Sequence, residues 1–490
     1  MSLWDSYFIM QEKSLRLNTI INILRSILSI LFPLITFKYA SVILGSTGIG
    51  IANFSQSVVA YFQLFATFGI TTYAVAEGAK LRSDKVRFQQ FASEIFTLNI
   101  ITTLISFAAM LLISVFGLFG GYNIYIYVLS STLLFNLIGF EWMFTVFEQF
   151  LYITLRSLLF QILSVILLFI LVKDKNDLLI YVGLIAFATG GSSVFNFYKS
   201  KEFFRLEISP IESLKRHWMP LLVIFGTSIA SLIYVNSDII LLGIISGNEA
   251  VGVYSAGVKI VKAVCVPIAS VGLVVVPRIA ERIAQGNIKE VEAICNKAME
   301  FMCFFIFPFA IGLFLLSKEA ILLLSSPDFL NGSIVIQLLL LDLFLSPING
   351  FLVSQLLVPF GKQNVSFWAT ICGALGNIFL DLLMIPIFSI YGAAIATVVS
   401  ELIVFLICVP CLKQQINLWV IVKGIWQYFV AALLIIPIFL FVEQFDMGII
   451  ISSVLTILIG GFAYVIALRM MNNIVLDSLT QMIDTKLNLR

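Results

Sequence analysis

The chain has 490 residues, of which 60% are hydrophobic and only 11% are charged, with a formal net charge of +2. Soluble domains carry about 25% charged residues, so this composition predicts an all-α protein that crosses a membrane many times. The single histidine, His217, excludes histidine-rich metal sites and disfavours a Ser-His or Cys-His nucleophile. The mixed charge pattern lacks a basic stripe and argues against nucleic acid as a partner. We therefore expect no catalytic residue, no metal and no bound cofactor.

Apolar stretches long enough to cross a bilayer follow one another along the whole sequence. A helix needs about 20 mostly apolar residues to span the hydrocarbon core. Charge clusters and Gly, Pro or Asn residues divide the chain into fourteen candidate spans, near residues 18–39, 49–79, 93–119, 123–143, 149–172, 178–199, 218–245, 250–276, 298–317, 333–359, 365–388, 391–411, 419–442 and 447–469.

The placement of Lys and Arg tests this count, because cytoplasmic loops carry the excess of positive charge. With a cytoplasmic N-terminus, 22 of the 29 basic residues fall in or beside inside connections. Only four fall outside, namely Lys38, Lys173, Lys175 and Lys318. A miscounted span would destroy this alternation, so we expect about fourteen transmembrane helices with both termini in the cytoplasm.

A short repeat divides the chain into two halves and a tail. Gly-Ser-Thr-Gly-Ile-Gly-Ile at residues 45–51 follows the first span, and Gly-Asn-Glu-Ala-Val-Gly-Val at residues 247–253 follows the seventh, at an offset of 202 residues. An even number of spans preserves direction, and parallel repeats occur in transporters. We predict an N-lobe of six spans at residues 1–205, a C-lobe of six spans at 206–413, and two further spans with a short cytoplasmic tail at 414–490.

Three basic residues, Arg25, Lys259 and Lys262, are assigned to neither an inside nor an outside connection and lie within predicted spans. A cation near the bilayer centre costs about 2.5–3.5 kcal/mol even on the most lenient scale. Facing lipid, the three would together cost on the order of 8–10 kcal/mol, comparable to the stability of a whole domain. They must therefore face water, a partner or a ligand, and an anion-attracting cavity is our preferred interpretation.

Polar side chains recur at helical spacing on four spans, which places each set on one helix face. A water-filled cavity between two six-helix lobes explains all four sets together. The other interpretation is that these side chains only join neighbouring helices. The sets are Asn18, Asn22, Arg25 and Ser29 in span one, Asn53, Gln56, Gln63 and Thr67 in span two, Thr227, Ser231, Tyr234 and Asp238 in span seven, and Ser255, Lys259 and Lys262 in span eight.

Asp238, Asp342, Asp381 and Glu401 are acidic residues that lie inside spans. For Asp238 we favour a structural pairing with Lys259 or Lys262. Asp342, Asp381 and Glu401 lie outside the four polar sets, and they either pair structurally, which we favour, or bind a coupling ion. No phosphate-binding Gly-x-x-x-x-Gly-Lys-Ser/Thr motif is present, so the chain does not carry its own ATP motor.

Several short motifs follow one another along the chain in a specific order. The first half has Phe-Pro-Leu-Ile-Thr at residues 32–36, glycines at 45, 48 and 50, and Phe-Ala-Thr-Phe-Gly-Ile-Thr at 65–71. The second half has the motifs at residues 238–243 and 247–256, and Pro386 followed by Tyr-Gly-Ala-Ala-Ile-Ala-Thr at 391–397. In these motifs and their order the sequence resembles the Wzx-type polysaccharide flippases. One departure lies at residues 141–148, where the family often has an aromatic-Gln-Gly element, and this weakens a gate role for Glu148 and Arg156.

The resemblance implies the fold of the multidrug/oligosaccharidyl-lipid/polysaccharide exporter superfamily, with two six-helix lobes around a central cavity and alternating access. It also implies the substrate, an undecaprenyl-pyrophosphate-linked oligosaccharide flipped from the inner to the outer leaflet of a bacterial cytoplasmic membrane. In such flippases a cationic cavity receives the pyrophosphate, and Arg25, Lys259 and Lys262 match it by span. The polysaccharide polymerase machinery is an expected neighbour, and the membrane potential or a proton or sodium gradient is the expected energy source.

Three other functions are compatible with many spans. An ion-coupled exporter of drugs or organic cations would need an acidic cavity, whereas span one offers Arg25. A flippase for peptidoglycan lipid precursors is chemically closer to our preferred function. A membrane-embedded glycosyltransferase or polymerase would need large extracytoplasmic loops, and the outside connections here are short.

Overall fold

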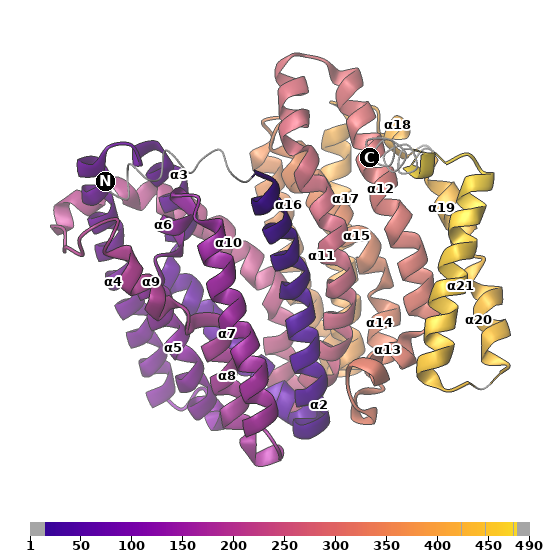
Figure 1. Cartoon of the computed structure of the whole chain (residues 1–490), viewed down its shortest axis with the longest axis horizontal. Helices are drawn as coiled ribbons and strands as arrows, with labels where there is room; N and C mark the ends of the chain where they lie inside the picture. The colour runs from indigo at the N-terminus through magenta and orange to yellow at the C-terminus, as the bar shows by residue number, and fades with distance from the viewer. Residues whose placement is uncertain (1–14, 423, 446, 474, 478–490) are drawn as a thin grey trace. The chain divides into compact units, whose positions relative to one another are not determined.

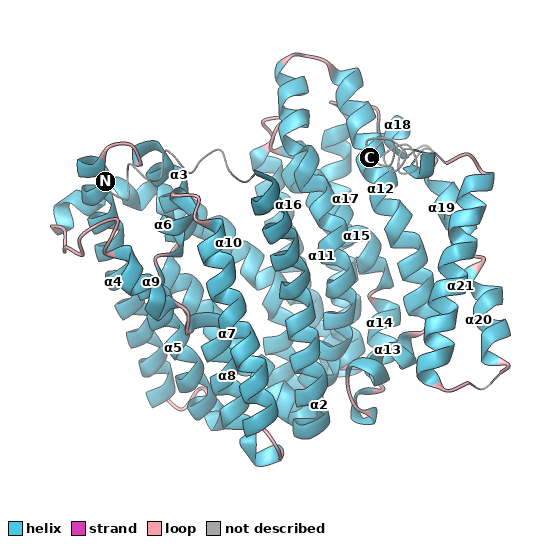
Figure 2. Cartoon of the chain, in the orientation of Figure 1, coloured by secondary structure: helices cyan, strands magenta, loops and turns pink. Residues whose placement is uncertain are grey.

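The computed structural model describes residues 15–422, 424–445, 447–473 and 475–477, without the side chains of residues 15–30, 273, 420 and 421. Its described residues form helices joined by turns, and none of them forms a strand (Figure 2). Thirteen helical ranges within this part of the chain are long and apolar enough to cross a membrane. The first of them, Leu31–Leu81, contains parts of the first two predicted spans, separated by a break at Gly45. The predicted all-α fold with about fourteen spans is therefore confirmed.

Packing divides the chain into two compact units, residues 1–240 (unit 1) and 241–490 (unit 2). Because this division follows packing alone, the predicted lobes 1–205 and 206–413 and the tail 414–490 stay a prediction. Unit 1 contains α2 (Leu15–Thr67), α3 (Ile70–Leu81), α4 (Lys85–Val115), η1 (Gly120–Tyr122), α5 (Asn123–Gly139), α6 (Glu141–Val146), α7 (Phe150–Leu171), η2 (Lys175–Asp177), α8 (Leu178–Gly190), α9 (Ser193–Ser200) and most of α10 (Ile211–Ile245) (Figure 1).

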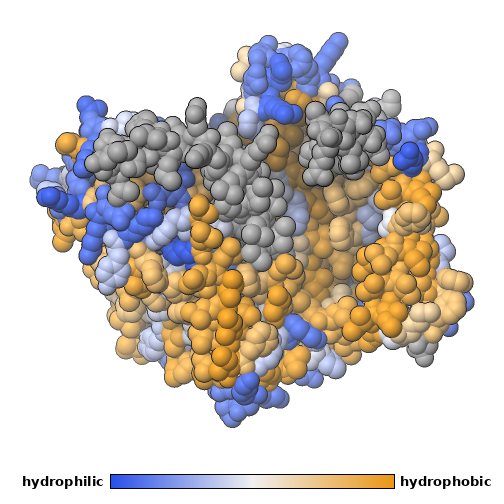
Figure 3. Space-filling view, in the orientation of Figure 1, coloured by the Kyte–Doolittle hydropathy of each residue, from blue (hydrophilic) through white to orange (hydrophobic). Residues whose placement is uncertain are grey.

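Helix α7 shows how these helices divide their surface between the core and the lipid. Leu155, Leu159, Ile162 and Ile166 are exposed at helical spacing on one face. Phe160, by contrast, is buried. Exposed apolar side chains in such number fit a hydrocarbon surrounding rather than water. On the face shown in Figure 3, hydrophobic residues form a band over the helices of unit 1, with hydrophilic residues gathered near the helix ends.

The two repeat glycines share an unusual backbone conformation. Gly45, inside α2, has φ 68° and ψ −179°. Gly247, at the N-terminus of α11 (Asn248–Ala284), has φ 87° and ψ −179°. This region of conformational space is essentially confined to glycine, because any Cβ would clash. The same rare turn at the same 202-residue offset supports the internal repeat.

Three helical stretches of unit 1 are interrupted within or at the end of their membrane-spanning part. Between α2 and α3, Phe68 and Gly69 have φ values of 45° and 77°, and between α5 and α6, Phe140 has φ 43°. The third break separates α8 from α9 at residues 191–192. Side chains from neighbouring helices satisfy freed carbonyl groups, as membrane burial requires. The Thr102 hydroxyl donates to the Ala66 oxygen at 2.6 Å, and the Asn196 amide donates to the Gly139 oxygen.

Unit 2 is built around α11, which is continuous in spite of two prolines. Its other helices are α12 (Ile288–Leu315), α13 (Ser317–Leu324), η3 (Pro327–Phe329), α14 (Gly332–Leu338), α15 (Leu340–Gly350), the π-helical segment η4 (Phe351–Leu357), α16 (Gln363–Phe388), α17 (Ile390–Lys413), α18 (Leu418–Val422), α19 (Ile425–Ala432), α20 (Ile435–Glu443) and α21 (Ile449–Met470).

Glycines bring α11 close to its neighbours in unit 2. A Cβ on Gly257 would lie 2.9 Å from Val335 and 3.0 Å from the Gly332 oxygen, both in α14. A Cβ on Gly272 would overlap the side chain of Gln355 in η4. Small residues at such positions let helix backbones approach one another, which is how helices gain packing energy in a membrane. This packing fixes the face of α11 that carries its polar residues.

Candidate functional site

The predicted cationic residues of span eight lie one turn apart on α11. Lys259 is half-buried, whereas Lys262, one turn further along, is exposed. Both stand within the apolar, membrane-spanning part of that helix. Arg25 belongs to α2, but its side chain lies outside the described residues, as do those of Asn18 and Asn22. Unit 2 therefore supplies two of the three predicted cations from a single helix turn.

Two of the predicted acidic residues lie near Lys262 inside unit 2. Asp342 of α15, Glu401 of α17 and Lys262 all act electrostatically on the thiol of Cys265, one turn along α11. Asp342 and Glu401 are 2% and 5% exposed. The Asn349 amide holds Glu401, donating to its carboxylate and, at 2.8 Å, to its backbone oxygen. Nothing in the sequence signals that these acids lie near the cationic helix, because they come from helices far apart along the chain.

The remaining polar residues of unit 2 are buried on α11, α16 and α17. Asp381 is fully buried on α16, with the buried Asn377 one turn before it. Ser255 of α11 is 6% exposed. The position of α11 beside α17 is fixed by Tyr254, whose hydroxyl lies 3.2 Å from the Thr397 hydroxyl. Unit 2 therefore buries polar groups on several of the helices around α11.

Of the polar residues predicted on span seven, some are exposed and others are buried. Thr227 and Ser231 are exposed on α10, and their hydroxyls donate to backbone oxygens of the same helix. Tyr234 is half-buried and Asp238 is buried. Because the hydroxyls of Thr227 and Ser231 bond only within α10, these hydrogen bonds do not decide whether the two residues bind a substrate.

A polar pocket of about 330 Å³ lies entirely within unit 1. The three helix breaks border it, since residues on both sides of each break line its wall. Gln56 of span two lies in this wall, whereas Asn53 of the same set is half-buried one turn earlier on α2. The polar side chains of the wall are Gln56, Gln63, Thr67, Thr71, Asn99, Thr132, Asn136, Glu141, Thr189 and Ser193.

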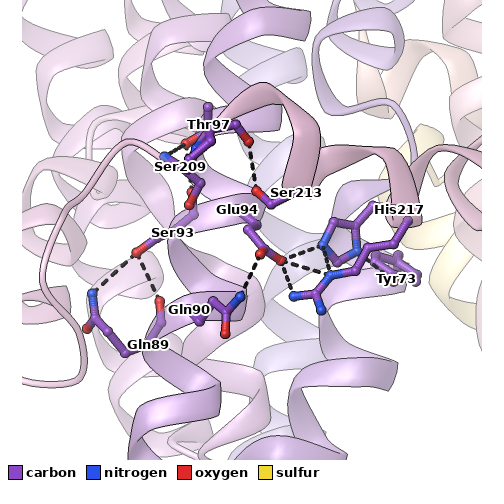
Figure 4. A network of polar contacts seen from close by, with 11 residues as sticks. Tyr73, Gln89, Gln90, Ser93, Glu94, Thr97, Ser209, Ser213 and His217 are labelled. Atoms are coloured by element: carbon purple, nitrogen blue, oxygen red, sulfur yellow. Dashed lines mark hydrogen bonds and ion pairs between the residues drawn. The ribbon is translucent and has the colours of Figure 1, made fainter.

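An acidic residue that the sequence did not single out organises the other polar region of unit 1 (Figure 4). Glu94 of α4 is fully buried and accepts from Arg216 and, at 2.8 Å, from His217 Nε2. Because a carboxylate can only accept, Nε2 carries the proton, and Nδ1 of a neutral ring accepts from the Tyr73 hydroxyl at 2.8 Å. This cluster binds the start of α10 to α3 and α4.

The second large cavity lies in unit 2 and is mostly apolar. It measures about 800 Å³, and its wall includes Met299 of α12, Phe351 of η4, Phe405 and Val409 of α17, and Trp419 of α18. Charged groups at this cavity include Glu292 and Lys413. Its lining suits hydrocarbon rather than hydroxyl groups.

Two known protein families match the chain over much of its length. A family described as "Polysaccharide biosynthesis protein" matches residues 15–282, and the MatE family matches residues 224–383. The chain belongs to the polysaccharide biosynthesis protein family. The predicted resemblance to a Wzx-type flippase is thereby confirmed. The chain is a multi-pass membrane transporter of the multidrug/oligosaccharidyl-lipid/polysaccharide exporter superfamily.

Curated relatives and solved structures agree with this family. Proteins named "Putative O-antigen transporter" from Escherichia coli (strain K12) and Shigella dysenteriae are 25% and 23% identical, over 76% and 78% of this chain and 91% and 96% of theirs. The inward closed lipid II flippase MurJ has a TM-score of 0.73 at 19% identity, covering 93% of this chain and 98% of that one. An inward-facing MATE transporter has a TM-score of 0.53 at 15% identity, covering 75% and 93%. The solved structures establish the fold alone.

Proposed function

We propose that the chain flips an undecaprenyl-pyrophosphate-linked oligosaccharide from the inner to the outer leaflet of the bacterial cytoplasmic membrane by alternating access. The observation that carries this proposal is the pair Lys259 and Lys262, one turn apart in a membrane-spanning helix. Support comes from the family match and from the O-antigen transporter names of relatives that align over most of their length.

The chemistry of the headgroup fits these cations. A pyrophosphate carries two or more negative charges, and Lys ammonium groups bind phosphate as point charges. We assign Lys259, Lys262 and Arg25 to the pyrophosphate, with the sugars in a hydrated cavity and the polyprenyl chain in lipid. Moving a doubly charged headgroup out of a negative-inside cell would release up to about 4.6 kcal/mol per 100 mV. The membrane potential could thus assist export without ATP.

The buried acids of unit 2 are possible sites for coupling transport to an ion gradient. Asp342, Asp381 and Glu401 are candidates for proton or sodium coupling, which is the alternative to a structural pairing. No bound cofactor is needed by this mechanism. A polysaccharide polymerase acting on the exported repeat units is the expected functional partner.

Neutralising the two lysines tests the proposal. In the K259Q/K262Q variant we expect at least a tenfold loss of flipping, because each charged hydrogen bond contributes about 1.5–3 kcal/mol. The assay is reconstitution of the full chain in vesicles with fluorescent lipid-linked oligosaccharide. The control is K289Q/K297Q, a matched pair of exposed lysines on α12, which should retain flipping. Undiminished flipping by K259Q/K262Q would contradict the proposal.

Two alternative functions predict different products in the cell. A multidrug or organic-cation exporter agrees with the MATE-like fold, and a peptidoglycan-precursor flippase agrees with the similarity to MurJ. Depletion of the chain separates the three functions. Accumulated polysaccharide repeat units support our proposal, accumulated peptidoglycan precursor supports the second alternative, and drug sensitivity without a lipid-linked intermediate supports the first.

A further inference from the structure

The polar pocket of unit 1 lies where three membrane helices are broken. Residues beside the breaks at Phe68–Gly69, at Phe140 and at residues 191–192 all line it. Irregular backbone within a membrane is tolerated only where it is buried in protein or lines a hydrated cavity. In transporters, interrupted helices of this kind commonly surround a substrate. The positive φ of Phe68 and of Phe140 also costs about 1–2 kcal/mol for each residue. A pocket with a purely structural role would give no reason to retain this strain.

The amide side chains of this pocket have hydrogen-bonding capacity to spare. Asn99 is only 8% exposed, and within the described part of the chain nothing bonds to its amide. Among the described residues nothing bonds to the side-chain amides of the half-buried Gln56 and the exposed Asn136 either. Gln63 receives only a 3.4 Å contact from Thr132. Residues that merely joined helices would bond to one another across the pocket. These amides can instead donate to and accept from a ligand.

The charge of the lining restricts the ligand class. No Lys or Arg belongs to the described lining, and Glu141, its only described acid, is exposed. The described lining therefore offers no positive counter-charge to an anion and no buried acid to an organic cation. Amides and hydroxyls in a wall that also contains the Trp142 ring suit an uncharged, hydroxyl-rich group. The volume of about 330 Å³ falls at the lower end of the range of roughly 300–1,000 Å³ for small-molecule sites.

We propose that this pocket binds a neutral sugar of the transported lipid-linked oligosaccharide. The proposal rests on the proposed function and deepens it, because it separates recognition of the sugar in unit 1 from attraction of the pyrophosphate by the lysines of unit 2. Asn99, Gln63 and Asn136 are the specificity-determining residues. Their amides would hydrogen-bond to sugar hydroxyls.

The test compares two probe lipids on the full chain in nanodiscs. One is undecaprenyl pyrophosphate, and the other is the same lipid carrying a single N-acetylglucosamine or galactose. We expect the wild type to bind a sugar-bearing lipid more tightly than the bare one. In N99L, affinity for the sugar-bearing lipid should fall about 3- to 10-fold, as expected for one neutral hydrogen bond, while bare-lipid affinity stays unchanged. Q161L, a half-buried amide of α7 outside the pocket, is the matched control.

Each outcome distinguishes this inference from the proposed function. An unchanged ratio between the two lipids in N99L and N136L overturns the pocket as a sugar site and leaves the function standing. Undiminished binding of both lipids by K259Q/K262Q overturns the cationic part of the function instead. Absence of preference for sugar in the wild type counts against the pocket. Asn136 is exposed on α5, so N136L keeps the test decisive if N99L does not fold.

Discussion

The two units handle buried polarity in opposite ways. In unit 1 the polar side chains of the pocket are mostly amides and hydroxyls. Elsewhere in unit 1, the buried acid Glu94 pairs with Arg216 and accepts a hydrogen bond from His217. In unit 2 a lysine and two buried acids act on the same stretch of α11, and the large cavity is apolar. The pocket of unit 1 thus presents mainly neutral dipoles, whereas unit 2 places charges along α11.

This difference follows from what each kind of group needs. A neutral amide inside a membrane protein needs only hydrogen-bond partners, which broken helices and their hydration can supply. A charge needs a counter-charge or a ligand, because desolvation alone costs several kcal/mol. A chain that moves an amphiphile with sugars and phosphates benefits from both environments.

The largest expected effect in unit 1 comes from removing its buried charge. The variant E94L should lower the free energy of unfolding by about 1.5–3 kcal/mol, because hydrogen bonds to a charged group are lost. His217 is then left buried, with the Tyr73 hydroxyl still bonded to its Nδ1. Arg216 loses less, since 56% of its side chain is exposed to solvent. Apparent melting temperatures in detergent would measure the loss.

A matched acid on the same unit serves as the control for this prediction. Glu212, exposed at the start of α10, should tolerate replacement by glutamine with little change in melting temperature. The variant E94Q should fall between the two, because its amide oxygen still accepts from Arg216. If E94L proved as stable as E212Q, the view that unit 1 depends on neutralising its buried acid would be wrong.

A smaller effect is expected where α11 of unit 2 packs by means of glycine. The variant G257A places a methyl group 3.0 Å from a backbone oxygen of α14, and overpacking of this kind costs about 1–3 kcal/mol. A methyl group on Gly312 of α12 would have nothing within 4 Å among the described residues. G312A should therefore be neutral or stabilising by up to about 1 kcal/mol. Equal melting temperatures for the two variants would show that α11 is not tightly packed there.

The spans, the fold class and the repeat could be predicted from the sequence because each depends on local patterns. The apolar stretches reappear as membrane-length helices, and the glycines at 45 and 247 adopt the same rare conformation. The helical face that carries Gln56, Gln63 and Thr67 was also predicted, and all three line one pocket. Their location inside unit 1 was not predicted.

What the sequence missed depends on tertiary contacts or on unusual backbone. Phe68 and Phe140 adopt positive φ, which their residue type disfavours, so neither residue itself signals the break at which it lies. Glu94 meets Arg216 across 122 residues, and no spacing rule connects such positions. The grouping of Asp342 and Glu401 near Lys262 likewise depends on which helices pack on α11.

The smallest effect is expected at an exposed ion pair of unit 1, Arg82 with Glu148 at 2.6 Å. Their side chains are 34% and 48% exposed, so solvent screens the pair and its contribution should be about 0–1 kcal/mol. The variant E148Q should lower the melting temperature slightly in low salt and not at all in high salt, since screening removes the difference. Flipping should be unchanged, because this residue belongs neither to the pocket nor to the cationic helix. A loss of flipping at unchanged stability would instead assign Glu148 to the transport cycle, and an exposed ion pair of unit 1 would then have a role in transport beside the cations that we propose.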